Sequence, residues 1–295
     1  MKKKMLFLIN PHAGKSEIRN CLLDIIDLFT KHDFSVTTRT TQPSGKNVKE
    51  GDDRYDLIVC CGGDGTLNES VNGLMELKSR PLFGYIPTGT VNDFATSLGL
   101  SRNPLEAAEA IAKGSAFACD VGLFNEKYFT YIAAFGAFTE VSYQTPQQAK
   151  NIFGRTAYIL EGIKQLPNIK SYHVSFEYSG GKIEDDFIFG MITNSSSVGG
   201  FQVNNKTDIF MDDGLFEVTL VKGAKNLTER RMIINSLLLQ EADSNFIYTF
   251  KTSELHIVSE SDIPWTLDGE FGGAPREVNI TNQNRALKII TVPDK

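Results

Sequence analysis

The stretch CCGGDGTLNES (60–70) brings together Gly62, Gly63, Asp64 and Gly65 directly after an apolar run. Glycines lack Cβ atoms, so their backbone can turn sharply and approach a ligand closely. The free N–H groups at the start of a following helix attract phosphate, but an aspartate would repel it unless a cation lay between them. The stretch therefore indicates either a phosphate site with Mg²⁺ or a plain turn from strand to helix, with Thr66 and Asn68 as expected helix caps.

Similar polar turns follow other strand-like runs. IPTGTVNDFA (86–95) places a Gly-Thr turn before Asn92 and Asp93, NPHAGK (10–15) follows the first apolar run, and Thr41 follows another. Ligands of open α/β sheets bind outside the carboxyl ends of the strands. We therefore expect these turns to meet at one edge and to form one site for a phosphorylated ligand.

A pair of carboxylates stands in the second half of the chain. WTLDGEFGGAP (265–275) carries Asp268 and Glu270 on either side of Gly269. Alternate residues of an extended segment project to the same side, so both carboxylates are expected to face one cleft. A carboxylate in such a cleft could act as a general base and take the proton of a hydroxyl. The alternative is a hairpin turn built on Asp-Gly.

Two familiar phosphate motifs do not match. A Walker A loop ending in HAGKS needs a glycine where Ile9 stands, and the dinucleotide fingerprint needs one where Asn68 stands. The four histidines and four cysteines have no spacing typical of a metal site. We expect the cysteines to be reduced packing residues of a cytosolic protein.

The elements that must position these residues change in type along the chain. Strand-like runs (5–9, 34–40, 55–61, 81–86) alternate with helix-like runs (17–32, 67–78, 92–98, 104–113) over the first part. This alternation predicts a doubly wound α/β domain over 1–122. Short strands then dominate, with helices expected only at 146–165 and 227–239. They predict a β-sandwich domain over 123–285, and a last strand in 286–295 that could return to the first domain.

Composition narrows the function classes. The 295 residues are 41% hydrophobic, enough for a full core without disulfides. A net charge of −6 argues against nonspecific nucleic-acid binding. No apolar run approaches the ~20 residues that span a bilayer, and the start MKKKMLFLIN has too short an apolar core for a signal peptide.

The combination of GGDGTLNE, PTGTVNDFA and NPHAGK resembles the catalytic domain of the diacylglycerol kinase family of lipid kinases, which includes sphingosine and ceramide kinases. The resemblance covers nearly the whole chain. It implies that ATP binds at Asn10, Pro11, His12, Ala13, Gly14, Lys15, Thr41, Gly62, Gly63, Asp64, Gly65, Thr66, Leu67, Asn68, Thr90 and Asn92. For Lys15 the alternative is a solvated lysine at a helix entry.

The same resemblance assigns the remaining chemistry. It implies that Glu270 is the proton acceptor, that Asp268 orients it or helps with the metal, and that Asp64 takes part in catalysis. Mg²⁺ is expected at Asp64, Asp93 and Asp120, directly or through water; a solvated hinge carboxylate is the alternative for Asp120. A second, structural Mg²⁺ is implied at Asp213 and at the carbonyl groups of Phe210 and Leu215, with a solvated turn as the alternative.

Two departures from the family pattern accompany this resemblance. Thr207 and Ile209 stand where relatives often have Pro and Ala, which puts the geometry of the second metal loop in doubt. Thr96 stands where many relatives have arginine, which suggests a subgroup with another lipid preference.

The resemblance also implies a lipid alcohol as acceptor, with diacylglycerol as the first candidate and phosphatidic acid as product. Alternatives are phosphatidylglycerol, undecaprenol or a sphingoid-like lipid, a soluble acceptor such as NAD, and a non-catalytic binding protein. We expect a cytoplasmic protein at the inner face of the membrane, without a transmembrane segment; a homodimer stays open. The basic and apolar segments 147–170 and 230–240 are candidates for membrane contact, or for packing on the sandwich.

Overall fold

The computed structural model describes residues 2–13, 18–42, 46–136, 170–195, 197–198, 201–202, 209–226, 228–229, 231–233 and 245–292. Gly14, Lys15 and Thr207 lie outside these ranges. So do the segments 147–170 and 230–240, apart from residues 170 and 231–233, and the two helices predicted at 146–165 and 227–239, apart from 228–229 and 231–233. None of the helices in the described ranges is long and apolar enough to cross a membrane.

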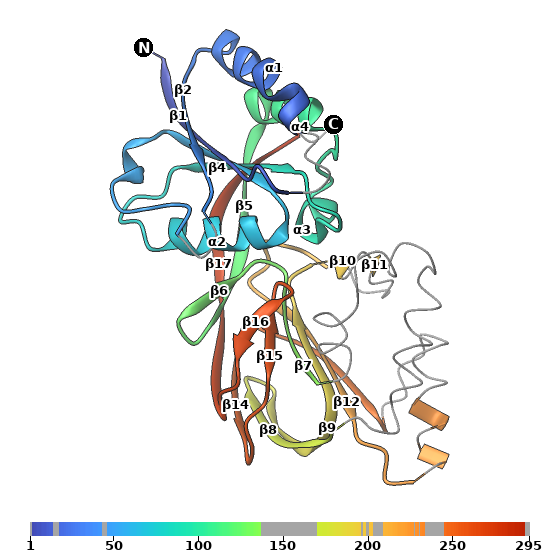
Figure 1. Cartoon of the computed structure of the whole chain (residues 1–295). Coiled ribbons are helices and arrows are strands. Elements are labelled where there is room, and N and C mark those ends of the chain that lie inside the picture. Colours follow the sequence, from blue (N-terminus) through green and yellow to red (C-terminus); the bar gives the residue numbers. More distant parts are fainter. Residues whose placement is uncertain are drawn as a thin grey trace.

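The first unit is a parallel sheet with helices on both faces (Figure 1). Its strands lie in the order β4-β3-β1-β2. They are β1 (Lys3–Ile9), β2 (Phe34–Thr40), β3 (Leu57–Gly62) and β4 (Leu82–Pro87). The helices are α1 (Ile18–Lys31), α2 (Asp64–Met75), α3 (Asp93–Ser97) and α4 (Pro104–Lys113), with a 3-10 turn η1 at Asp52–Arg54.

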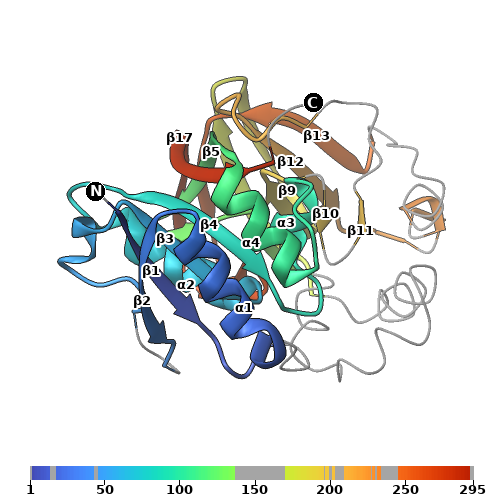
Figure 2. The same cartoon turned by 90° about the horizontal axis from the view of Figure 1, so that it is seen from above.

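Alternation along β1 explains why both faces are covered. Met5 and Phe7 pack with residues of α1 and α4, whereas Leu6 and Leu8 pack with residues of α2. Successive strand residues point to opposite faces, so an uninterrupted apolar strand requires helices on both sides. Seen from above, α1 and α4 lie side by side (Figure 2).

The second unit is rich in strands. Its strands, with the two that join it to the first unit, are β5 (Ser115–Phe124), β6 (Lys127–Phe129), β7 (Ile132–Gly136), β8 (Tyr172–Tyr178), β9 (Gly181–Thr193), β10 (Ser197–Val198), β11 (Phe201–Gln202), β12 (Phe216–Lys222), β13 (Ile247–Thr252), β14 (Glu254–Ser259), β15 (Trp265–Leu267), β16 (Glu270–Gly273) and β17 (Glu277–Thr291). Its core gathers large aromatic side chains, including Phe135, Phe176, Phe187 and Trp265. The predicted combination of an α/β unit and a β-rich unit is confirmed.

Two long strands, β5 and β17, run through both units (Figure 1). Near its start β17 pairs with β14, and near its end Ile289 pairs in parallel with Phe83 of β4. The register of β17 against β5 shifts between Gln283 and Leu287, where Arg285 has a φ of 53°. The domain limits predicted at 122 and 285 fall inside these shared strands, and the division itself stays a prediction.

Candidate active site

The predicted turns lie together at the carboxyl edge of the first sheet. Asn10 N–H donates to the Cys61 carbonyl (2.9 Å), and Thr41 N–H donates to the Ile9 carbonyl (2.9 Å). Thr88 N–H donates to the Gly62 carbonyl (2.9 Å). These bonds join the ends of neighbouring strands, so the segments after β1, β2, β3 and β4 are brought side by side.

Two glycine turns at this edge are in backbone contact. A Cβ atom placed on Gly89 would lie 2.6 Å from the Cα of Gly63, which is closer than non-bonded carbon atoms approach. A Cβ atom on Gly62 would lie 2.5 Å from the Cβ of Thr66. Glycine is therefore required at positions 62 and 89. The turns after β3 and β4 form one continuous surface of backbone atoms.

Asp64 begins helix α2 and has one unpaired oxygen. Its Oδ2 accepts a hydrogen bond from Asn92 N–H (2.8 Å), whereas its buried Oδ1 has no partner among the residues that the structure describes. Burial, and then the charge of nearby Asp93, raise the pKa of Asp64 to about 7. A cation at Oδ1 would satisfy this oxygen and favour the ionised carboxylate.

The start of α2 differs from the prediction. The helix begins at Asp64 rather than at Leu67, and Gly63 precedes it without any capping side chain. Thr66 and Asn68 do not cap: the Thr66 hydroxyl accepts from Asn10 Nδ2 (2.8 Å), and Asn68 Nδ2 donates to Asp268 (2.7 Å). The stretch 62–65, called the glycine loop below, thus runs into the first turn of the helix. The N–H groups of this turn are left open to a ligand. The Leu67 side chain, by contrast, is buried in the core.

Asp268 is an anchor inside the protein. Its carboxylate accepts five hydrogen bonds of 2.7–3.1 Å, from Thr130 N, Thr130 Oγ1, Asn68 Nδ2, Tyr131 N and Ile132 N. Burial raises the pKa of Asp268, although the five donors favour its anion. With every oxygen occupied, Asp268 holds the β15–β16 turn in place.

Glu270 lies on the outside of the same hairpin. The expectation that Asp268 and Glu270 face one cleft is not met, because Asp268 and Gly269 form a turn with φ values of 48° and 87°, and alternation does not hold through such a turn. The Glu270 side chain is exposed, and its Oε1 lies 3.3 Å from the position of a Cβ on Gly65. An acid of the second unit thus reaches the first turn of α2, next to Asp64.

Helix α2 also fastens the two units together through Asn72. Its amide pairs with both backbone groups of Tyr128, accepting from N–H (2.9 Å) and donating to the carbonyl (2.9 Å). Asn72 Nδ2 also donates to Asn68 Oδ1 (3.1 Å), and Asn68 Nδ2 donates to Tyr128 O (3.1 Å). Helix α2 therefore carries the glycine loop at its start. With Asn68 and Asn72 it also holds Tyr128, and the residues that follow Tyr128, 130–132, anchor Asp268.

Replacing Asn72 with alanine is expected to lower both stability and turnover. The Tyr128 N–H loses its partner, which costs about 1–3 kcal/mol for a polar group left unsatisfied, whereas the Tyr128 carbonyl keeps its bond from Asn68. The hairpin that carries Glu270 loses support, so kcat should fall while KM for ATP stays unchanged. Urea unfolding and hydrogen exchange at residues 128–132 would measure the loss. Asn20→Ala, at an exposed position of α1, is the control; unchanged exchange in the Asn72 variant would contradict this role.

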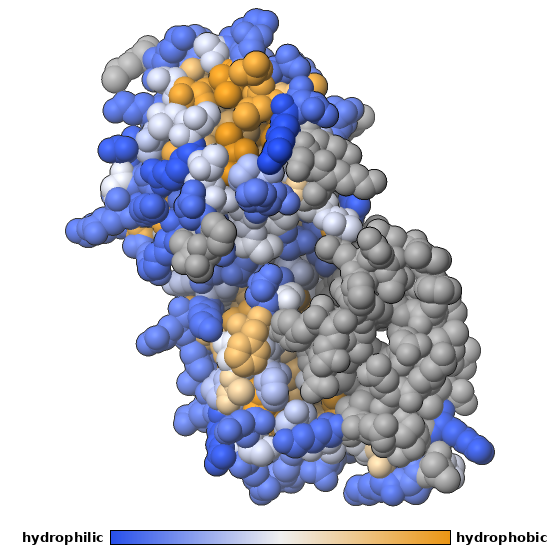
Figure 3. Space-filling model, in the orientation of Figure 1, coloured by the Kyte–Doolittle hydropathy of each residue, from blue (hydrophilic) through white to orange (hydrophobic). Residues whose placement is uncertain are grey.

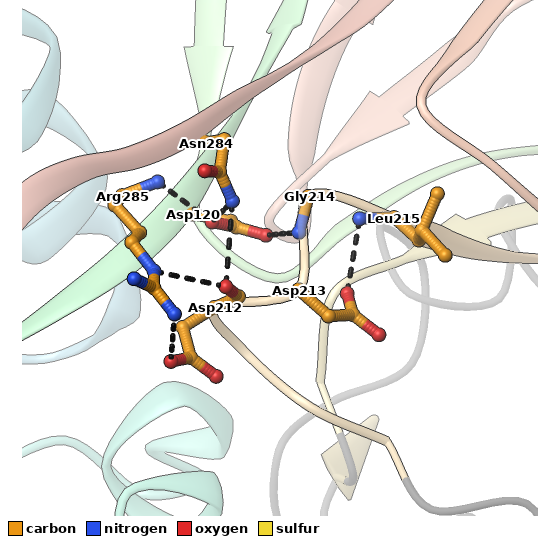
Figure 4. A network of polar contacts seen from close by, with 7 residues as sticks. All are labelled: Asp120, Asp212, Asp213, Gly214, Leu215, Asn284 and Arg285. Atoms are coloured by element: carbon orange, nitrogen blue, oxygen red, sulfur yellow. Dashed lines mark hydrogen bonds and ion pairs between the residues drawn. The ribbon is translucent and has the colours of Figure 1, made fainter.

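Asp120 lies in a different polar network, on β5 (Figure 4). Its fully buried carboxylate accepts from Asn284 Nδ2 (2.9 Å) and Arg285 N–H (2.7 Å) at one oxygen, and from Gly214 N–H (2.7 Å) at the other. The Arg285 guanidinium pairs with Asp212 (3.1 Å). Within the described ranges, no three His, Cys, Asp or Glu side chains are grouped to hold a metal ion. That Asp64, Asp93 and Asp120 together hold Mg²⁺, directly or through water, stays a prediction.

The loop before β12 carries the second expected metal ligand, Asp213. Its Oδ1 accepts from Leu215 N–H (3.0 Å), and its Oδ2 lies 3.7 Å from Lys251 Nζ. Phe210 is exposed in the same loop. A lysine thus already supplies positive charge to this carboxylate.

Sequence reasoning missed Asn72 and the contacts of the Asn68 side chain. The available signal was their spacing, since residues four apart on a helix share a face. Two asparagines on one face of a helix behind a glycine loop indicate a contact with backbone groups of another segment. Their partner, Tyr128, has no signal in the sequence.

Known proteins are similar to this chain in sequence. Residues 4–124 match the family model of the diacylglycerol kinase catalytic domain. The diacylglycerol kinase of Bacillus subtilis is 34% identical over 278 residues, which cover 92% of this chain and 91% of the relative. The diacylglycerol kinase of Staphylococcus epidermidis is 33% identical over 300 residues, covering 100% of this chain and 94% of the relative.

Solved structures agree with the sequence comparison. The crystal structure of a diacylglycerol kinase from Bacillus anthracis is similar with a TM-score of 0.74 and 25% identity, covering 98% of this chain and 97% of that one. An NAD kinase from Archaeoglobus fulgidus in complex with ATP shares the fold alone, with a TM-score of 0.55, 13% identity, and coverage of 98% and 93%. The chain therefore belongs to the diacylglycerol kinase family and is a kinase.

Proposed function

We propose that this kinase transfers the γ-phosphate of ATP to the hydroxyl of a membrane lipid alcohol, with diacylglycerol as acceptor and phosphatidic acid as product. The observation that carries the proposal is the approach of the Glu270 carboxylate to Gly65. It brings a proton acceptor from one unit to the phosphate-binding turn of the other. The names of the curated relatives support the choice of diacylglycerol.

The nucleotide would lie along the carboxyl edge of the first sheet. Open N–H groups at the start of α2 suit its phosphates, and the contact between Gly63 and Gly89 leaves a floor without side chains. The proposed contacts are Asn10, Pro11, His12, Ala13, Gly14, Lys15, Thr41, Gly62, Gly63, Gly65, Thr66, Thr90 and Asn92.

Mg²⁺ fits beside Asp64. The unpaired buried Oδ1, with the Asp93 carboxylate nearby, offers oxygen ligands of the kind that Mg²⁺ prefers. When bound, the ion would offset the charge of the phosphates during transfer. Asp120 would act through water, because its own oxygens already accept three hydrogen bonds. A second ion at Asp213 and the carbonyl groups of Phe210 and Leu215 would share Asp213 with Lys251.

The acceptor would approach from the exposed side of the β15–β16 hairpin. Glu270 would take the proton of its hydroxyl, while Asp268 keeps the turn rigid. Phe271, the next residue, is 61% exposed, and Figure 3 shows a hydrophobic patch over this hairpin, in addition to a larger one over the first unit. An exposed apolar surface beside the base suits a lipid better than a soluble acceptor. We place the reaction at the inner surface of the membrane.

An acceptor panel tests the proposal. Radiolabelled ATP is supplied with Mg²⁺ and mixed micelles that contain diacylglycerol, phosphatidylglycerol, undecaprenol or a sphingoid base, and separately with NAD. Labelled phosphatidic acid is expected, and its formation should stop when the divalent ion is chelated. A label on another lipid would change the acceptor but keep a lipid kinase. A label on NAD alone would overturn the lipid acceptor.

A further inference from the structure

Tyr131 is a buried tyrosine of the site whose side chain no motif predicts. It precedes β7 and is 6% exposed. Its N–H donates to Asp268 Oδ1 (3.0 Å), and its carbonyl accepts from Thr193 Oγ1 (2.7 Å) and Asn194 N–H (3.1 Å). These three bonds fix the backbone at Tyr131, and its side chain packs in the hydrophobic core.

The hydroxyl of Tyr131 lies at the turn that carries the proposed base. Oη is 3.8 Å from the position of a Cβ on Gly269, the residue between Asp268 and Glu270. It makes no hydrogen bond with any residue that the structure describes. Tyr85, the other buried tyrosine near the glycine loop, differs: its hydroxyl is within hydrogen-bond distance of the Gly62 carbonyl (3.2 Å) and of Asn92 Oδ1 (3.3 Å).

Because no described residue bonds to it, the hydroxyl of Tyr131 is free to donate to a ligand. Burial raises the pKa of Tyr131 well above its ordinary value of 10, and the charges of Asp64, Asp268, Asp93 and Glu270 raise it further. The hydroxyl thus keeps its proton and acts as a donor. The position of Oη itself is given by its contact with the turn at Gly269, between Asp268 and Glu270.

We propose that Tyr131 Oη donates a hydrogen bond to an oxygen of the alcohol acceptor and holds its hydroxyl between Glu270 and the phosphate-binding turn. The acceptor rather than a phosphate is the partner, because Oη lies at the turn that carries Glu270, whose proposed role is to take the proton of the alcohol. The alcohol then donates its proton to Glu270 and accepts from Tyr131, so both of its hydrogen-bonding functions are used. This inference rests on the proposed function and adds a second contact to its acceptor site.

The test is Tyr131→Phe, which removes only the hydroxyl. No described protein group loses a partner, so the melting temperature should not change. We expect kcat/KM for diacylglycerol in mixed micelles to fall about 10- to 100-fold, as expected for the loss of one well-placed donor. KM for ATP should stay the same. Tyr178→Phe, whose ring stacks on Phe250 at 4.2 Å in the second unit, is the matched control and should keep wild-type kinetics.

Each outcome has one meaning. A rise in KM for ATP as large as the fall in kcat/KM for the acceptor, or a fall in kcat/KM that accompanies a lower melting temperature, would make Tyr131 a structural residue and overturn the inference. So would an unchanged kcat/KM in an active variant. A wild-type protein that phosphorylates no alcohol would overturn the proposed function and this inference together, whereas an active wild type with an equally active Tyr131→Phe variant would overturn the inference alone.

Discussion

Glu270→Gln is expected to lower kcat about 10²- to 10⁴-fold, the usual contribution of a general base, while the protein stays as stable as the wild type. The Glu270 side chain is exposed and accepts no hydrogen bond from any described residue, so glutamine removes a proton acceptor and little else. Binding of ATP should hardly change, because the proposed partner of Glu270 is the acceptor. Initial rates at saturating ATP and lipid, together with thermal melts, measure both halves of this expectation.

The control for Glu270 is Glu126→Gln, an exposed acid in the turn between β5 and β6. It tests whether loss of one negative charge on the second unit alters activity by itself. Asp268→Asn should behave differently from both variants, because it would place an NH₂ group among five donors and destabilise the hairpin. Wild-type turnover in Glu270→Gln would remove this residue from the role of base.

Asp64→Asn is expected to abolish stabilisation by Mg·ATP but not to destabilise the protein without ligand. In the absence of an ion, burial and Asp93 raise the pKa of Asp64 to about 7, above the value of about 4 of an unfolded aspartate. A raised carboxyl pKa means that the folded state binds more protons, so stability falls as pH rises from about 4 to 7. Asparagine has no such dependence.

Thermal melts at pH 5 and pH 8 check this expectation. Without ligand, the melting temperature of Asp64→Asn relative to the wild type should be higher at pH 8 than at pH 5. With Mg·ATP, the wild type should gain stability and the variant should not. Asp53→Asn, at an exposed acid of η1, is the control. Equal stabilisation of Asp64→Asn and wild type by Mg·ATP would contradict a metal-binding role.

The first unit could be predicted well from the sequence because its strands are apolar on both faces. β2 has the predicted bounds, and β1 and β3 differ from them by two residues at most. The start of α2 could not be predicted, because glycine and aspartate have low helix propensity. The hydrogen bond from Asn92 N–H to Asp64 stabilises this turn instead, and it is a tertiary feature.

The residue types of the site could be predicted from the sequence, but the directions in which their side chains point could not. The spacing of Asp268 and Glu270 suggested a shared cleft, yet two left-handed residues in the turn send one inward and leave the other outside. Asp120 illustrates the same limit. Its partners at 214 and 284–285 depend on the pairing of β5 with β17 and on the register shift in that pair, which no local pattern in the sequence records.

The path of β17 has a consequence for synthesis of the chain. β4 lies between β3 and β17, so the strand that pairs with β4 on its other side comes from residues near 289. A ribosome that has made the first 125 residues has therefore not yet supplied all the strands of that sheet. One edge of β4 therefore stays unpaired until almost the whole polypeptide has emerged. The sheet of the first unit is completed last, although most of its strands are made first.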